Sequence, residues 1–174
     1  NGLNSNAFTE HGNCNSFPHY YLYSEQLRKK GVDIKSIPGI EAYFIHSLED
    51  WQNAYDEKQK SKEEAKLVKV DNCKTNYEDE NETRELANKE DIIKKRNHLI
   101  LLSQNEQGLK NLFTLVSKSY KNGFYRFPRM DFDMIKEHSD GLICLTACIS
   151  GPFASEIFKG QHREKSFDEI QMDL

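Results

Sequence analysis

The sequence lacks the features that mark a membrane or secreted protein. No apolar run approaches the ~20 residues that a membrane-spanning helix needs, and the opening residues, NGLNSN, have neither the basic start nor the apolar run of a secretory signal. We therefore expect a soluble chain with no membrane partner. The chain begins at Asn1 rather than at a methionine, and its last residues are FDEIQMDL, so we interpret it as a fragment or a processed piece.

Cysteine is also scarce. The four cysteines form no CxxC pair and are too few in 174 residues for a disulfide-stapled secreted scaffold: Cys14, Cys73, Cys144 and Cys148. This pattern favours free thiols in a reducing compartment, which is the cytoplasm.

A strong excess of positive charge is absent too. The formal net charge is −4, which argues against a whole surface that attracts nucleic acid. Most of the imbalance lies in residues 49–96, which contain 14 acidic and 11 basic residues. Leu48, Trp51 and Tyr55 have helical spacing, whereas residues 71–83 contain almost no apolar side chain and favour a mobile loop. We expect 49–96 to be a charged insertion that carries helices on the surface of one domain.

The rest of the chain alternates between strand and helix patterns. We expect strands at 3–9, 34–45, 98–104 and 141–150, the last two buried, and helices at 16–30, 105–120, 131–138 and 152–160. Pro38 and Gly39 are expected to interrupt the second strand. Such alternation predicts an α/β fold with parallel strands, and both a barrel and a doubly wound sheet fit it.

Two details of packing follow from the patterns. In the helix at 105–120, the apolar spacing predicts that four side chains face the core: Leu109, Leu112, Phe113 and Val116. Cys144, in the strand at 141–150, is expected to be a buried strand residue.

Four residues with metal-binding side chains lie near the expected strand edges: His11, Glu41, His98 and Cys148. In parallel α/β folds chemistry collects where strands end, and imidazole, carboxylate and thiolate together suit zinc or a similar divalent ion. Each residue also has a structural interpretation, as a hydrogen-bonded histidine, a solvated glutamate or a small buried cysteine. The sequence alone does not show that the four converge.

A basic and aromatic segment, SKSYKNGFYRFPR at 117–129, contains no acidic residue. Cations bind phosphates and aromatic rings stack on bases, so the segment is a candidate nucleic-acid contact. The alternative, which we favour, is a helix end whose bases complement the helix dipole, followed by aromatic residues that pack inward. The candidate contacts are Lys118, Lys121, Arg126 and Arg129.

Five segments, in chain order, give the chain a specific resemblance: TEHGN, GIEAYF, RNHLILLSQNEQGLKNLFTLVSKSY, NGFYRFPRMD and EHSDGLICLTACISG. Together they resemble the PHP (polymerase and histidinol phosphatase) domain of bacterial DNA polymerase III α subunits. The resemblance runs from about residue 2 to residue 160, apart from the insertion, which is similar to phage-encoded versions. If the chain is phage-encoded, the compartment expected for it is the host cytoplasm. The resemblance implies a distorted (β/α)7 barrel with a cluster of up to three metal ions at the strand ends, here in part, over residues 1–174.

The resemblance also implies roles for single residues. His11 and His98 match two motif histidines, Glu41 matches a glutamate that bridges metals, and Cys148 matches a position where polymerase members place a cysteine. Gly12 then lets the chain turn sharply away from the first strand. The cofactor implied is a cluster of zinc, manganese or magnesium, and the chemistry is metal-assisted phosphoester hydrolysis.

The chain departs from the family pattern in two ways. Glu10 stands where the family usually has aspartate, so it either orients His11 from behind or indicates a decayed site. The family's opening H-x-H and late D-x-H motifs are absent, which leaves about half of a metal site. Four further histidines match no motif and are expected at the surface or in caps: His19, His46, His138 and His162.

Three functions follow. The first is the PHP part of a polymerase subunit whose parent, a nucleotidyltransferase, performs template-directed DNA synthesis. The polymerase active site lies outside these residues, and the PHP domain acts as a 3′–5′ exonuclease or as a structural brace. Its partners are then DNA, the remaining polymerase domains and other replisome subunits. The second is a free-standing phosphoesterase of the histidinol-phosphatase kind. The third is a metal-free interaction module of a replisome.

Overall fold

The computed structural model describes residues 4–68 and 92–162. The chain divides into two units, a smaller one formed by Ser47–Lys95 and a larger one formed by the rest of the chain. The predicted insertion covers nearly the same residues as the first of these units. The loop predicted at 71–83 lies outside the described residues.

Within the described residues of the larger unit, six strands form one sheet. They are β1 (Ser5–His11), β2 (Lys35–Phe44), β3 (Asn97–Ser103), β4 (Phe124–Tyr125), β5 (Phe127–Met130) and β6 (Leu142–Leu145). The longest, β2, is central: β1 and then β5 pair along successive parts of one of its edges, and β3 pairs along the other. The sheet is completed by β6 on β3 and by β4 on β5.

The sheet is mixed, so the prediction of parallel strands is only partly right. β2 is parallel to β1 and β5, whereas β3 is antiparallel to both β2 and β6. The reason lies in how β2 connects to β3. Phe44 at the end of β2 pairs with Asn97 at the start of β3, so the segment between them returns to its starting point instead of crossing over the sheet. The mixed α/β class is confirmed, and the partial (β/α)7 barrel remains a prediction.

Strand β2 runs without a break through Pro38 and Gly39, so the predicted interruption is wrong. β3 pairs with β2 only from Gly39 onward, and the proline therefore sits where β2 has a single partner strand, β1. A missing N–H is tolerated at such a position. Gly39 permits close packing, because a Cβ there would lie 2.5 Å from the Leu102 side chain.

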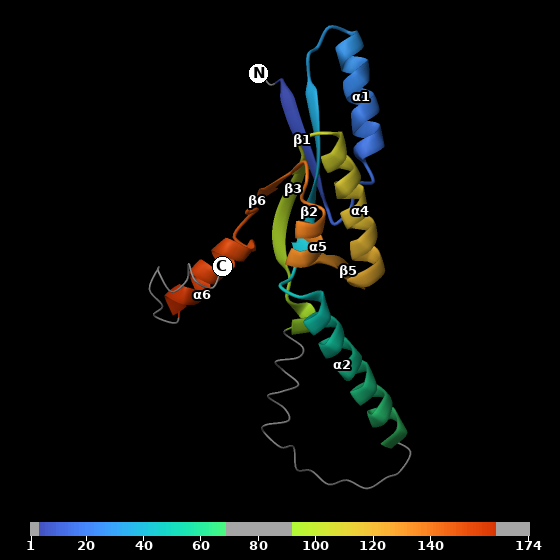
Figure 1. Ribbon diagram of the computed structural model, residues 1–174, viewed down its shortest axis with the longest axis vertical. Coiled ribbons are helices and arrows are strands. Elements are labelled where there is room, and N and C mark those ends of the chain that lie inside the picture. The colour runs from blue at the N-terminus through green and yellow to red at the C-terminus, as the bar shows by residue number, and fades with distance from the viewer. Residues whose placement is uncertain (1–3, 69–91, 163–174) are drawn as a thin grey trace. The chain divides into compact units, whose positions relative to one another are not determined.

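All four helices predicted for the larger unit are confirmed: α1 (Phe17–Lys29), α4 (Glu106–Asn122), α5 (Phe132–Glu137) and α6 (Pro152–His162). Figure 1 shows α1 above α4 along the sheet, and the rings of Phe17 and Phe113 meet between the two helices at 5.9 Å. Asn105 caps α4 by accepting a hydrogen bond from the Gly108 N–H at 2.9 Å. Asp131 caps α5 through the Met134 N–H, also at 2.9 Å.

The buried face of α4 differs from the prediction. Leu112 is fully buried as expected, but Phe113 is 41% exposed, and Leu115 is fully buried in its place. The first turn of α4 explains the rotation. A Cβ on Gly108 would lie only 1.8 Å from the Gly141 carbonyl oxygen, so the helix must present its glycine to the chain that enters β6. The face of α4 that contains Gly108, Leu112 and Leu115 is therefore the one that faces the core.

Strand β6 is exposed, which corrects the prediction of a buried strand at 141–150. Ile143 is 43% exposed and Leu145 is 45% exposed, and Cys144 between them is exposed too, not buried as predicted. The apolar run was misleading because β6 lies at the end of the strand order and, in the described residues, pairs with β3 alone.

The smaller unit contains α2 (Leu48–Val68), which confirms the helix predicted from Leu48, Trp51 and Tyr55. Trp51 is 3% exposed, stacks on Tyr55 at 5.5 Å and donates a hydrogen bond to the Ile93 carbonyl at 3.3 Å. The location of this unit on the surface of the domain stays a prediction. Among residues 4–68 and 92–162, no helix has both the length and the apolar content to cross a membrane.

Candidate metal centre

The turn after β1 sets one side of the centre. Gly12 adopts a φ of +67°, a conformation that L-residues rarely adopt, which confirms the sharp turn predicted for it. Its N–H donates a hydrogen bond to the Glu41 carbonyl at 2.8 Å. Because β1 and β2 are parallel and His11 is in register with Glu41, the imidazole and the carboxylate come from neighbouring positions of adjacent strands.

Glu41 lies between two histidines. Its Oε1 is 2.7 Å from His98 Nδ1, and its Oε2 is 3.5 Å from His11 Nε2. The antiparallel register of β2 and β3 makes the first contact possible, because Tyr43 pairs with His98 and the side chains of Glu41 and Tyr43, two residues apart, share a face of the sheet. The Glu41 carboxylate thus contacts two imidazoles, each through a different oxygen.

Cys148 completes the cluster from the turn after β6. Its Sγ lies 3.6 Å from His98 Nδ1, and one donor atom from each of Glu41, His98 and Cys148 lies within 4.8 Å of the others. A backbone hydrogen bond ties this turn to the start of β3, because the His98 N–H donates to the Ser150 carbonyl at 3.0 Å. Within the turn, the Ser150 N–H donates to Cys148 Sγ at 3.4 Å.

Three of the four predicted ligands therefore converge, and His11 lies beside them at the exposed rim. Its side chain is 63% exposed, against 24% for His98 and 18% for Glu41, and its ring centroid is 6.0 Å from that of His98. The arrangement leaves His11 facing solvent. That these residues bind metal remains a prediction.

Glu10 takes a different position from the one predicted. Its two carboxylate oxygens accept hydrogen bonds from the Ser16 N–H at 2.8 Å and the Ser16 hydroxyl at 2.6 Å. In the described part of the chain it engages the start of α1 and not His11, so it fixes the connection between β1 and α1. Burial, with the nearby Glu10 charge second, raises the pKa of the Cys14 thiol to about 12.

Sequence reasoning missed Tyr43, which packs against the centre. Its ring lies 5.8 Å from that of His98, 6.3 Å from that of His11 and 4.9 Å from that of Phe127. Burial raises the pKa of the Tyr43 hydroxyl. The signal was present in the two-residue spacing from Glu41, which places both side chains on one face of a strand.

The four predicted nucleic-acid contacts differ in their exposure to solvent and in their partners. Arg129 is 1% exposed and donates to the Tyr125 and Phe127 carbonyls at 2.8 and 3.0 Å, so it cannot reach a phosphate backbone and is withdrawn from the set. Burial lowers the pKa of its guanidinium to about 10. Lys118 lies 3.0 Å from the Glu137 carboxylate. Lys121 and Arg126 are exposed.

The histidines outside the centre behave as predicted where they can be placed. His19 and His46 are exposed, and His138 caps the end of α5, where its N–H donates to the Ile135 carbonyl at 3.2 Å. The side chain of His162 lies outside the described residues.

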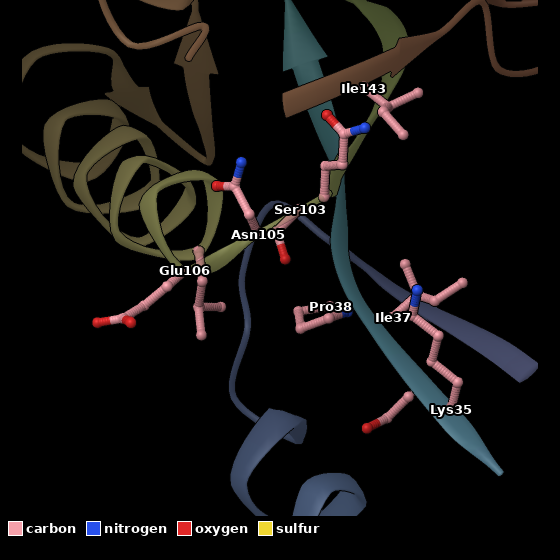
Figure 2. Close-up of a pocket in the computed structure, with 10 residues that line it drawn as sticks. Lys35, Ile37, Pro38, Ser103, Asn105, Glu106 and Ile143 are labelled. Carbon is pink, nitrogen blue, oxygen red and sulfur yellow. The ribbon is translucent and has the colours of Figure 1, made fainter. Parts of the chain in front are cut away.

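A pocket of about 510 Å3 lies at the other end of the same strands. Figure 2 shows that the pocket is lined by Lys35 and Pro38 from the start of β2, by Ser103 at the end of β3 and by Asn105, the N-cap of α4. Glu41 lies toward the end of β2, and His98 lies at the start of β3. The candidate metal centre is therefore separate from this pocket.

Comparison with known proteins gives the family. The PHP domain model matches residues 1–172. DNA polymerase III subunit alpha of Aquifex aeolicus is 33% identical over 97% of the chain and 12% of its own length. The Borreliella burgdorferi subunit is 37% identical over 83% of the chain and 9% of its own length. The Helicobacter pylori subunit (strain 26695) is 30% identical over 95% of the chain.

The chain spans about a tenth of the length of these relatives. The predicted resemblance is confirmed, since the family model covers nearly all residues and the curated relatives are polymerase subunits. This chain belongs to the PHP domain family.

Proposed function

We propose that this chain is the PHP part of a DNA polymerase III α subunit and that its strand-end cluster is a metal-dependent phosphoesterase centre. The observation that carries the proposal is the convergence of Glu41, His98 and Cys148 within 4.8 Å. The reaction we infer is hydrolysis of a phosphodiester, with removal of a 3′-terminal nucleotide as its form on DNA. Template-directed synthesis belongs to the rest of the parent subunit, with DNA, the other polymerase domains and further replisome subunits as partners.

The donor set fits a divalent metal. Carboxylate oxygen, imidazole nitrogen and thiolate sulfur are all zinc ligands, and nitrogen and sulfur ligands of one tetrahedral zinc are roughly 3.6 Å apart. The separation of His98 Nδ1 and Cys148 Sγ is 3.6 Å. Glu41, His98 and Cys148 would offer three protein ligands, the number found in catalytic rather than structural zinc sites. The soft sulfur favours zinc over manganese or magnesium.

The side chains have distinct parts in the proposed reaction. Without the ion, Glu41 orients both imidazoles, because each of its oxygens faces a different histidine. The proton shared by Glu41 and His98 Nδ1 would have to leave for both atoms to bind the ion. Tyr43 excludes water from one side by packing its ring against both. A bound divalent ion would supply Lewis-acid stabilisation of phosphoryl oxygens and acidify water. His11, at the exposed rim, is the residue best placed to exchange a proton with a leaving or attacking oxygen.

The test begins with the metal itself. The full chain is dialysed against zinc, manganese or magnesium, and the bound ions are counted by mass spectrometry. We expect Cys148→Ser and Glu41→Gln to lose stoichiometric metal. Cys144→Ser, a matched exposed cysteine on β6, should retain it.

Hydrolysis is then measured on a phosphodiester such as bis(p-nitrophenyl) phosphate. We expect a large loss of rate for Cys148→Ser and an unchanged rate for Cys144→Ser. A chain that binds no stoichiometric ion would instead favour a metal-free brace or interaction module. Bound metal without hydrolysis would refute the catalytic proposal and leave a structural metal site.

A further inference from the structure

The end of α4 and the hairpin β4–β5 expose two aromatic rings. Tyr120, on α4, is 46% exposed and Phe124, on β4, is 53% exposed. Their rings are stacked, with centroids 5.5 Å apart and planes at 17°. Figure 1 shows that α4 leads directly into this hairpin. Aromatic side chains exposed together in this way offer a π-face on which a nucleic-acid base can stack.

Arg126 forms the tip of the hairpin in a strained conformation. It is the single residue between the paired Tyr125 and Phe127, and its φ is +62°. Arginine is disfavoured there, whereas glycine or asparagine fits with little strain. Strained residues of this kind cluster at functional sites, where the surrounding structure holds them in place. The Arg126 guanidinium lies 5.6 Å from the centre of the Tyr125 ring.

A buried clamp holds the tip rigid. Arg129 Nη1 donates to the carbonyls of Tyr125 and Phe127, the two residues that flank Arg126. The Arg129 N–H also donates to the Gly123 carbonyl at 3.1 Å, which ties β5 to the end of α4. The exposed rings and the tip cation are thus presented on a fixed frame, which lowers the entropy lost on binding.

The charge of this face suits a polyanion. Residues 117–130 contain no acidic residue. Lys118 is offset by Glu137, and the exposed Lys121 and Arg126 remain as cations of the segment on the described surface. Alternating cations and stacking rings are the pattern by which proteins bind single strands, whose bases are free to stack, rather than duplexes.

The hairpin also borders the metal centre. The Phe127 ring is 4.9 Å from that of Tyr43, which contacts His98. A Cβ on Gly12, next to His11, would lie 2.8 Å from the Pro128 side chain. A strand held on the hairpin therefore lies next to the centre proposed to hydrolyse it.

We propose that Tyr120, Phe124, Lys121 and Arg126 form a binding face for single-stranded DNA. The face itself is argued from this surface, and the choice of DNA over RNA rests on the proposed function. The face is separate from the metal ligands, so binding does not require the ion.

The test measures fluorescence anisotropy of a labelled single strand of about 15 nucleotides, a length near the upper site size of small single-strand modules. The full chain is used in low salt with EDTA. Tyr120→Leu and Phe124→Leu remove the π-faces while keeping apolar bulk, and we expect each to weaken binding about tenfold. Arg126→Gly should weaken binding and lower the salt dependence by about one phosphate contact, while its melting temperature does not fall. Tyr23→Leu and Lys30→Gln, exposed positions of α1 and its end, are matched controls that should bind normally.

Three results would overturn the proposal: no binding by the unchanged chain, unaltered binding by both ring variants, or tighter binding of a duplex of the same sequence. Equal affinity for a single-stranded RNA would overturn the assignment to DNA. Because EDTA is present, failure of the metal proposal leaves these measurements unaffected. Conversely, hydrolysis of the small diester does not depend on this face, so the two proposals fail separately.

Discussion

Replacing Gly12 with alanine perturbs the turn that follows β1 at the candidate centre and that is hydrogen-bonded to Glu41 of β2. Two penalties combine there. An L-residue at a φ of +67° costs about 1–2 kcal/mol. The new Cβ would also lie 2.8 Å from Pro128 and 3.1 Å from Tyr43, and overpacking of this kind costs typically ~1–3 kcal/mol. We therefore expect the free energy of unfolding to fall by about 2–5 kcal/mol.

Gly31 offers a matched control for the backbone part of this penalty. It has a φ of +82°, but a Cβ there would meet no atom within 4 Å. Gly31→Ala should cost only about 1–2 kcal/mol, so the difference between the two variants isolates the clash at Gly12. Urea unfolding followed by far-UV circular dichroism measures both. Tryptophan fluorescence is less suitable, because Trp51 lies in the smaller unit.

The two variants should differ in metal binding as well. Gly12 is next to His11, and its N–H is bonded to the Glu41 carbonyl, so a shift of the turn displaces two residues of the centre. Zinc affinity should fall in Gly12→Ala and stay unchanged in Gly31→Ala. Equal destabilisation by the two alanines would refute the reasoning, since it would show that the turn relaxes away from Pro128 and Tyr43 without penalty.

Four further predictions concern stability and reactivity. Arg126→Gly should raise the free energy of unfolding by about 1 kcal/mol, because it relieves the left-handed strain; a lower value in urea unfolding would show that the tip is not strained. Arg129→Met should lower the free energy of unfolding by about 3 kcal/mol, because the Tyr125 and Phe127 carbonyls lose a charged hydrogen-bond donor. Urea unfolding would contradict this prediction if the measured loss is within experimental error. Cys14, whose pKa is raised from 9.0 to about 12, should react with maleimide at pH 8 far more slowly than the exposed Cys148, and comparable labelling rates would contradict its burial. The raised pKa means that Cys14 contributes its full stabilisation below pH 9 and loses it as the pH rises toward 12, a fall that Cys14→Ala should reduce.

Much of the secondary structure could be predicted from the sequence, because the interactions that begin and end helices are local. The helices were predicted within a few residues, since caps such as Asn105 and Asp131 act on neighbouring N–H groups. The errors concern burial, which depends on contacts between segments that are far apart in the sequence. Phe113 has the helical spacing of a core-facing residue of α4. The close approach of Gly108 to Gly141 nevertheless turns its side chain outward. Strand β6 is apolar enough for a core, yet its place in the strand order exposes it.

By itself, the sequence determined the family and the chemical types at the centre. Residue identities and their order along the chain suffice for that, and they singled out His11, Glu41, His98 and Cys148 before any contact was known. Tertiary structure alone decided how these residues relate. The register of β1, β2 and β3 brought the carboxylate between two imidazoles, and burial turned Arg129 into a clamp while leaving Arg126 at a strained, exposed tip. Distances between side chains depend on pairing between segments far apart in the chain, and no local pattern encodes that pairing.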